Sequence, residues 1–181
     1  NIMSLNTNWQ QANGSACAEI DQGDNLVFDG TTTTNADWNN TLTQVANVTI
    51  NSGYTGTISI GTAAATTTGD FTVNSGTVSA IGAGLFKIGG NLAVGTGGTV
   101  TGPGNVQLYG TAKTLGGLGS SSFSDLAING AITLAGNITV TNVLTIMPMG
   151  IFSAATYTIT LSGTGTPLVH TGATFNNQVG T

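Results

Sequence analysis

The sequence predicts an all-β protein, a β-solenoid (β-helix) of short strands wound in coils of about 20 residues. Three observations predict this fold class. Apolar residues occur in pairs two positions apart, such as Leu126 and Ile128. These pairs recur every 20 residues, and a glycine follows each recurring pair, at positions 90, 110, 130 and 150. Repetition at a fixed period of this size is typical of a solenoid.

The spacing within each pair identifies the element as a strand. A strand sends residues i and i+2 to the same face, whereas a helix needs spacings of three and four. Between 126 and 146 the pairs start six residues apart, so the Asn, Gly, Ala and Thr residues between them are predicted corners. The predicted core consists of the paired residues Phe86, Ile88, Val106, Leu108, Leu126, Ile128, Ile132, Leu134, Ile138, Val140, Leu144 and Ile146.

The regular region from 86 to 146 is expected to point its even-numbered residues inward. The same rule assigns three less apolar pairs to the interior: Gly98/Val100, Ala112/Thr114 and Leu118/Ser120. The recurring glycine is expected at a corner that needs either a positive φ or close approach of another backbone. Coils stacked in this way would be about 4.8 Å apart, the spacing of neighbouring strands in a sheet.

Residues 1–45 differ from the rest of the chain. They contain both tryptophans and five of the seven acidic residues, and they show no clear 20-residue period. Terminal repeats of a solenoid are atypical because they must cover the first coil. We therefore expect 1–45 to form an N-terminal cap and 46–181 to form the coils, the first of them starting at Val48.

Composition limits the partners and the chemistry. Of 181 residues only 5% are charged, arginine is absent, and the net charge is −5, which argues against nucleic acid or an anionic membrane as a partner. No apolar run approaches the roughly 20 residues of a membrane-spanning helix, so no membrane insertion is expected. Cys17 is the single cysteine; a small buried thiol and pairing between subunits are both open.

The residues that catalysis would need are scarce. Hydrolytic or lyase chemistry needs clustered carboxylates, a general base or a cationic group for developing charge. The chain has one histidine, His170, and two isolated lysines, Lys87 and Lys113, whose odd numbers place them outward on the solvated surface. No enzyme activity, no catalytic residue and no organic cofactor is therefore predicted.

One acidic cluster is a candidate metal site. Asp21, Asp24 and Asp29 lie within nine residues, and oxygen ligands at this density suit Ca²⁺. The spacings of known calcium-binding loops are missing, and turn-forming Asp side chains explain the cluster equally well. Both interpretations remain open.

A second candidate site is formed by outward-facing threonines. Thr99-Val-Thr101 and Thr139-Val-Thr141 lie two periods apart on one face, with Gly119-Ser-Ser121 between them. Stacked Thr-X-Thr motifs on a flat face resemble the surface of ice-binding solenoids. The alternative is that threonine is simply favoured in strands, where its hydroxyls pair across neighbours.

Parts of the chain resemble a known class of repeat. The runs DNLVFDG (24–30), NVTINSGYTGTISI (47–60) and FSDLAINGAITLAGNITVTNVLTI (123–146) resemble the repeats of large secreted prokaryotic surface proteins. These are adhesin-like and autotransporter-passenger-like β-solenoids. The resemblance implies the fold and an extracellular, cell-surface location, and it implies no catalytic or binding residue, because the shared pattern is structural.

The two ends of the chain suggest self-association. The segment 168–181 is patterned like a coil but has no lysine, glutamate or proline to protect its open edge, so it would accept a strand or coil from another copy. Such head-to-tail contacts do not close and would grow into a filament. The predicted polymerisation residues are Ile2, Met3, Ser4, Leu5, Thr174, Phe175 and Val179.

The function predicted from the sequence is therefore a self-assembling subunit of an extracellular filament or surface layer. Its predicted partners are further copies of itself. The alternative is an adhesin or carbohydrate-binding fragment of a larger surface protein, which would bind surface glycans. An ice-binding solenoid is a third hypothesis. A rival explanation of the unprotected segment 168–181 is that the natural chain continues there with further coils.

Overall fold

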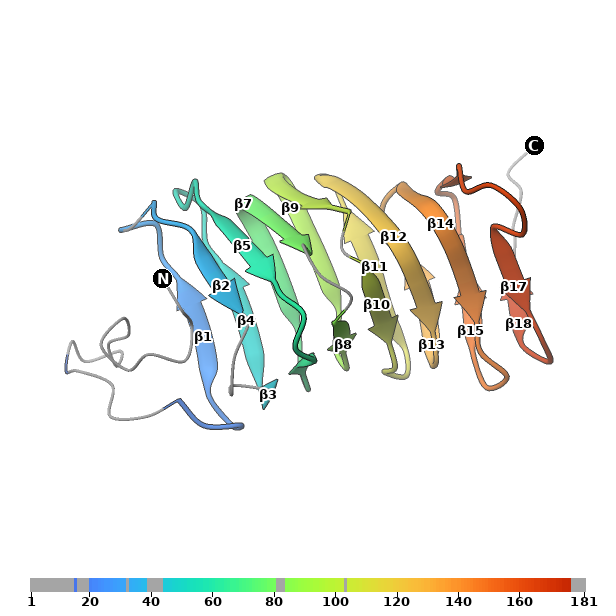
Figure 1. Cartoon of the computed structure of the whole chain (residues 1–181), viewed down its shortest axis with the longest axis horizontal. Helices are drawn as coiled ribbons and strands as arrows, with labels where there is room; N and C mark the ends of the chain where they lie inside the picture. Colours follow the sequence, from blue (N-terminus) through green and yellow to red (C-terminus); the bar gives the residue numbers. More distant parts are fainter. Residues whose placement is uncertain are drawn as a thin grey trace.

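The computed structural model describes residues 15, 20–31, 33–38, 44–80, 84–102 and 104–176. All regular secondary structure in these residues is β-strand. The strands wind into a β-solenoid of about 7 turns, with stacked coils about 21 residues apart, which confirms the predicted fold class. The coils follow one another along the long axis, from β1 at one end to β17 and β18 at the other (Figure 1).

The strands are short, and four of them run across a corner from one face to the next. Their bounds are β1 (Asn25–Phe28), β2 (Ala36–Trp38), β3 (Gln44–Val45), β4 (Asn47–Ile50), β5 (Thr57–Ile60), β6 (Ala65–Thr67), β7 (Phe71–Ala80), β8 (Leu85–Ile88), β9 (Leu92–Thr101), β10 (Asn105–Leu108), β11 (Lys113–Gly117), β12 (Ser120–Ile128), β13 (Ala131–Leu134), β14 (Ile138–Ile146), β15 (Ile151–Ser153), β16 (Ile159–Leu161), β17 (Leu168–His170) and β18 (Thr174–Asn176).

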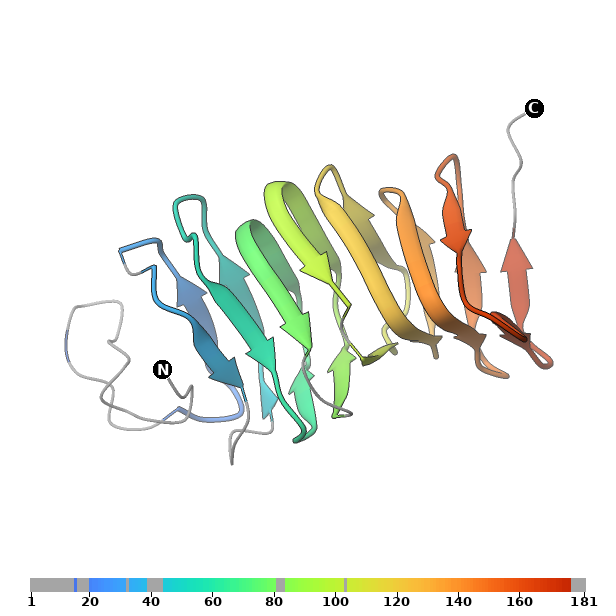
Figure 2. The ribbon, with the colours of Figure 1, turned by 45° about the horizontal axis from the view of Figure 1, so that its top comes forward.

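Parallel pairing between neighbouring coils divides the strands among three faces. Face 1 contains β1, β4, 71–73 of β7, 92–94 of β9, β11, β13, β15 and β18. Face 2 contains β2, β5, 77–80, 99–101, 120–123, 138–140 and β16. Face 3 contains β3, β6, β8, β10, 125–128, 143–146 and β17. Figure 2 shows the chain turning between these faces at the edges of the solenoid.

The core is a set of columns that run along the solenoid axis. All twelve predicted core residues are buried, and none of them is more than 3% exposed. On face 3 the register stacks Ile88, Leu108, Ile128 and Ile146 directly on one another. Because strand neighbours are about 4.8 Å apart, each side chain contacts its equivalent above and below. Full burial of one such side chain contributes about 1.5–3 kcal/mol.

The first paired coil begins earlier than the sequence pattern suggests. Strands β1, β2 and β3 pair with β4, β5 and β6, so the coils start at Asn25, inside the segment predicted as a cap and before Val48. Leu26/Phe28 and Ala36/Trp38 are inward pairs two positions apart, as in later coils. Asn25 pairs with Asn47 at an interval of 22 residues, so this coil does not follow the 20-residue period by which the later coils are detected.

The expectation that even-numbered residues point inward is wrong for one coil, and we call this expectation the even-number rule. Ala112, Thr114, Leu118 and Ser120 are exposed, and Leu115, Ser121 and Phe123 are buried in their place. The cause is the interval between paired strands: Leu115 pairs with Leu92, 23 residues earlier. Because side chains alternate with a period of two, an odd interval exchanges the inward and outward sets.

The recurring glycines mark close backbone contacts. A Cβ on Gly130 would lie 2.9 Å from the carbonyl carbon of Gly110, and one on Gly150 would lie 2.6 Å from the carbonyl oxygen of Ile128. Neither glycine has a positive φ. Of the two reasons expected for these glycines, close approach of the neighbouring coil therefore applies here.

Candidate functional site

The acidic cluster near the N-terminal end forms turns. The amide N–H of Asp21 donates to Oδ2 of Asp24 at 2.8 Å, and Oδ1 of Asp29 accepts from both the N–H (2.9 Å) and the hydroxyl (2.7 Å) of Thr31. These hydrogen bonds, chiefly the one from the Thr31 amide, hold the pKa of Asp29 below its ordinary value. Among the residues that the structure describes, no three His, Cys, Asp or Glu side chains are grouped so that they could hold a metal ion. The structure therefore does not gather the three predicted calcium ligands.

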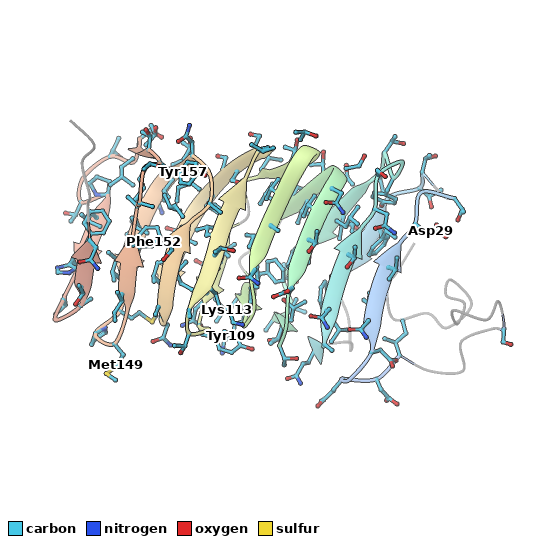
Figure 3. The ribbon with its side chains drawn as sticks, turned by 180° about the vertical axis from the view of Figure 1, so that it is seen from behind. Asp29, Tyr109, Lys113, Met149, Phe152 and Tyr157 are labelled. Atoms are coloured by element: carbon cyan, nitrogen blue, oxygen red, sulfur yellow. The ribbon has the colours of Figure 1, made fainter. Side chains whose placement is uncertain are left out.

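The two lysines and the histidine lie on separate coils. Lys87 is outward on face 3, between Thr66 and Gln107. Lys113 lies at the start of β11 on face 1, in register with the inward Ile132 and partly buried, so its predicted outward orientation is wrong: the odd interval that brings Leu115 inward also applies to Lys113. His170 is exposed at the end of β17 on face 3. Figure 3 shows Lys113 near Tyr109 at the edge of the solenoid, far from Asp29 at the N-terminal end. The structure does not bring these groups together.

A ladder of side-chain hydrogen bonds runs along the edge of face 1, and the sequence analysis missed it. Oδ1 of Asn25 accepts from Nδ2 of Asn47 (2.6 Å), and Oδ1 of Asn47 accepts from the N–H of Asp70 (2.7 Å). Asp70 in turn accepts from the N–H of Asn91 (2.7 Å), and Asn91 accepts from the N–H of Thr114 (2.9 Å). The available signal was an Asn or Asp directly before an apolar pair, as in Asn25-Leu26-Val27-Phe28.

Two ranks of hydroxyl side chains cover face 2. The register aligns Thr57, Thr77, Thr99 and Ser120 in one rank. The second rank includes Ser59, Ser79 and Thr101 and continues with Ser122, Thr139 and Thr160. Neighbouring hydroxyls are about 4.8 Å apart between coils and about 6.6 Å apart along a strand. The ranks contain no charged residue between Thr57 and Thr160, so the threonine motifs noted in the sequence belong to a longer uncharged array.

The C-terminal end of the solenoid leaves its inward residues half-exposed. β16, β17 and β18 each pair on one side, with β14, β14 and β15, and no described strand covers their other side. Ile159, Leu161, Leu168 and Phe175 extend the core columns but are only half-buried. Phe175 packs against Phe152, with ring centroids 6.0 Å apart. Unpaired strand edges over half-exposed apolar columns form a surface suited to a further coil.

The predicted polymerisation residues are only partly described. Thr174 and Phe175 lie in β18, at this open end. Ile2, Met3, Ser4, Leu5 and Val179 lie outside the described residues, as does Cys17. The candidate site that the structure describes is therefore the exposed edge formed by β16, β17 and β18, which we call the C-terminal edge.

No family model, curated protein or solved structure matches this chain. In the described part of the chain no helix is long and apolar enough to cross a membrane. The fold defines the protein as a β-solenoid repeat protein.

Proposed function

We propose that this protein is a structural, self-associating subunit of an extracellular filament or surface layer, and that its copies join head-to-tail. The observation that carries this proposal is the C-terminal edge. There Ile159, Leu161, Leu168 and Phe175 point into the core columns but are only partly buried. Covering them with the N-terminal end of another copy would bury the apolar surface of the C-terminal edge and pair its free strand edges.

The parallel ladder favours a head-to-tail arrangement. All pairings between described coils are parallel, so a second copy that stacks in the same direction continues each ladder. On face 1 the strand β18 would pair with β1 of the next copy, on face 2 β16 with β2, and on face 3 β17 with β3. A contact between two different surfaces does not close on itself, so it extends into a filament.

The distribution of charge favours the same direction. From Leu126 to Thr181 the sequence contains no Asp, Glu, Lys or Arg, whereas Asp21, Asp29 and Asp37 are exposed near the N-terminal end. Two N-terminal ends facing each other would oppose carboxylates, and an N-terminal end on the uncharged C-terminal edge would not. Charge therefore disfavours the head-to-head contact and leaves the head-to-tail contact free of like-charge repulsion.

The extracellular assignment is supported by the resemblance of the repeats to those of secreted prokaryotic surface proteins. In such an assembly the solenoid provides rigid length, because every coil contacts only its neighbours and adds one layer to the stack. Immunogold labelling of thin sections of cells of the source organism tests the location. Labelling confined to the cell interior would contradict it.

The assembly is tested by placing a negative charge on the C-terminal edge. Phe175→Asp and Leu161→Asp should each raise the concentration at which copies associate by about tenfold or more, since burial of one such side chain contributes about 1.5–3 kcal/mol and about 1.4 kcal/mol is tenfold. Thr133→Asp is the matched control, because Thr133 is exposed on face 1 away from both ends. Light scattering and negative-stain microscopy measure association, and circular dichroism verifies folding.

Two outcomes would contradict the proposal. Wild-type protein that stays monomeric at high concentration would exclude self-association. Association that survives both edge variants, or that Thr133→Asp abolishes equally, would mean that the C-terminal edge is not the contact. Monomers that bind glycans would favour the adhesin alternative.

A second candidate function rests on the two hydroxyl ranks of face 2. An uncharged array with a regular two-dimensional repeat suits a neutral, ordered partner, and ordered water at an ice surface is the candidate. Thr77→Lys and Thr99→Lys would interrupt the array, whereas Thr49→Lys on face 1 leaves it intact. If the array binds ice, the wild type and Thr49→Lys should inhibit ice recrystallisation and the two face 2 variants should not. Wild-type protein without this activity would exclude the candidate.

A further inference from the structure

One coil of the solenoid is joined to its two neighbours on face 1 by a strand whose pairs are staggered. Leu115 of β11 pairs with Leu92 in the coil before it and with Leu134 in the coil after it. The other strand pairs of β11 are staggered: Gly116 and Gly117 pair only toward β9, and Lys113 and Thr114 pair only toward β13. Toward the preceding coil Thr114 is held instead by its N–H and hydroxyl, which donate to Oδ1 of Asn91. Leu115 is therefore the single residue of this strand with a strand partner on both sides.

The same coil is weakly joined on face 2. β12 pairs with β9 only through Ser120 and Ser121, and its register toward β14 shifts between Phe123 and Asp125. Ser121 follows Val78 and Val100 in an apolar column and is 5% exposed. Its Oγ has no hydrogen-bond partner among the described residues. A buried hydroxyl without a partner loses its hydration and gains nothing in return, so it destabilises the closed coil.

On face 3 this coil is joined to its neighbours by an unbroken ladder of strand pairs. β10 pairs with both β8 and the second half of β12 through four consecutive residues on each side, in unbroken register. Val106, Leu108, Leu126 and Ile128 are all buried there. The ladder of face 3 is thus continuous at the level where the ladders of faces 1 and 2 are interrupted.

The backbone of the irregular coil has a positive φ at three residues. Ala112 has φ +54°, a left-handed value that a residue with a Cβ adopts only at a cost, and Gly116 and Gly117 have φ +101° and +156°. Leu118, between β11 and β12, is 85% exposed. These features are absent from the neighbouring described coils at 86–108 and 126–146, apart from the glycine at 102 with a positive φ.

From this geometry we propose that the coil from Gly110 to Phe123 is a hinge built into the solenoid. The coils before and after it separate on faces 1 and 2, and the continuous ladder of β8, β10 and β12 on face 3 acts as the hinge line. The solenoid therefore consists of two units that open at one level. This inference is independent of self-association, because it concerns the folded monomer.

Native-state hydrogen exchange, measured residue by residue on the monomer, tests the hinge. The amides of Leu115–Gly117 and Ser120–Ser122 should exchange about tenfold or more faster than those of 106–108 and 126–128 in the same layers, because local opening exposes weakly held segments first. Equal protection of the three faces, or fastest exchange on face 3, would overturn the proposal.

The variant Ser121→Val provides a second test, which distinguishes a hinge from a loop that is merely mobile. Valine matches Val78 and Val100 in the same column and removes the unpartnered hydroxyl, so exchange at 115–122 should slow by about tenfold. Ser79→Val, an outward substitution on the same face, is the control and should leave this exchange unchanged. If valine prevents folding, Ser121→Ala makes the same test with a smaller side chain. Unchanged exchange in the folded Ser121 variant would overturn the hinge.

Discussion

The two ends of the solenoid are built from the same repeat but differ in how deeply their inward side chains are buried. In the first coil Leu26, Phe28 and Trp38 are 3%, 6% and 1% exposed. In the last described coil Leu161 and Phe175 occupy equivalent inward positions and are half-exposed. Among the described strands β1 and β2, like β16 and β18, pair on one side only. The comparison therefore shows that the number of paired strands alone does not decide how deeply an inward side chain is buried.

Large aromatic side chains explain part of the difference. Near the N-terminal end Trp38 packs edge-on against Phe86 with centroids 6.0 Å apart, and Phe28 lies 5.3 Å from the ring of Tyr54. The hydroxyl of Tyr54 donates to the carbonyl of Thr34 at 2.9 Å, and burial raises the pKa of Tyr54. Side chains of this size reach beyond the neighbouring coil, whereas at the C-terminal end the contact between Phe152 and Phe175 leaves Phe175 only partly buried.

Substitutions midway between the ends should have the largest effect on folding stability, because there each core column has a coil on both sides. Ile128→Asp or Ile138→Asp should prevent folding, because an unpaired carboxylate in a dry core costs several kcal/mol against a total stability of about 5–15 kcal/mol. Thr133→Asp and Thr139→Asp, which face outward, should change stability by about 1 kcal/mol or less. Circular dichroism and urea unfolding measure both. Equal behaviour of the two pairs would contradict the inward and outward assignment.

The comparison of the ends is tested directly by truncating one leucine at each. Leu26→Ala removes a buried side chain and should cost about 2–4 kcal/mol of unfolding free energy. Leu161→Ala removes a half-exposed one and should cost the monomer about 1 kcal/mol or less. Urea unfolding at a concentration below association gives both values. If Leu161→Ala is as costly as Leu26→Ala, the C-terminal edge is covered in solution.

The hydrogen-bonded ladder belongs to the N-terminal half, and its removal should have a moderate effect. Asn91→Ala deletes the acceptor for the backbone N–H and the hydroxyl of Thr114, so it should cost about 1–2 kcal/mol. Asn129→Ala is the control, since Asn129 is exposed in the C-terminal half and has no part in the ladder. Thermal and urea unfolding compare the two variants. A loss no larger than that of the control would mean that water replaces these hydrogen bonds.

The smallest expected effect is the pH dependence of the first coil. The folded pKa of Asp29 lies below its ordinary value of 3.8, because Thr31 donates to the ionised carboxylate. The resulting stabilisation is fully present above that ordinary value and is lost as the pH falls through the lower folded pKa. Asp29→Asn should therefore reduce the acid sensitivity of thermal unfolding below about pH 4. If the pH profile of the variant equals that of the wild type, other carboxylates cause the acid sensitivity of unfolding.

Much of the fold could be read from local patterns. The alternation within Leu126/Ile128 and its 20-residue recurrence depend only on neighbouring residues and on period, so strands, coils and twelve buried positions followed from them. The even-number rule failed at Leu115 and Ser121, because one odd interval between coils changed the parity without a local signal. The first coil was overlooked at Leu26 and Phe28 because its interval is longer than the period of the later coils.

The candidate site was predicted less completely. The sequence placed Phe175 in an unprotected last coil, since a missing charge or proline is a local property. It did not show that Asn25, Asn47 and Asp70 share one ladder, or that Thr57 and Thr160 belong to one array. Those alignments depend on which residue of one coil pairs with which residue of the next.

The sequence by itself therefore determined that this chain winds into β-strand coils with an apolar interior and an almost uncharged surface. The reason is that strand alternation and the repeat period are properties of the chain within one coil. Only the tertiary structure decided the register between coils, and with it the half-exposed C-terminal edge, the hydroxyl ranks and the buried Ser121. These features arise from contacts about 21 residues apart in the chain, where the insertion of a single residue turns an inward side chain outward.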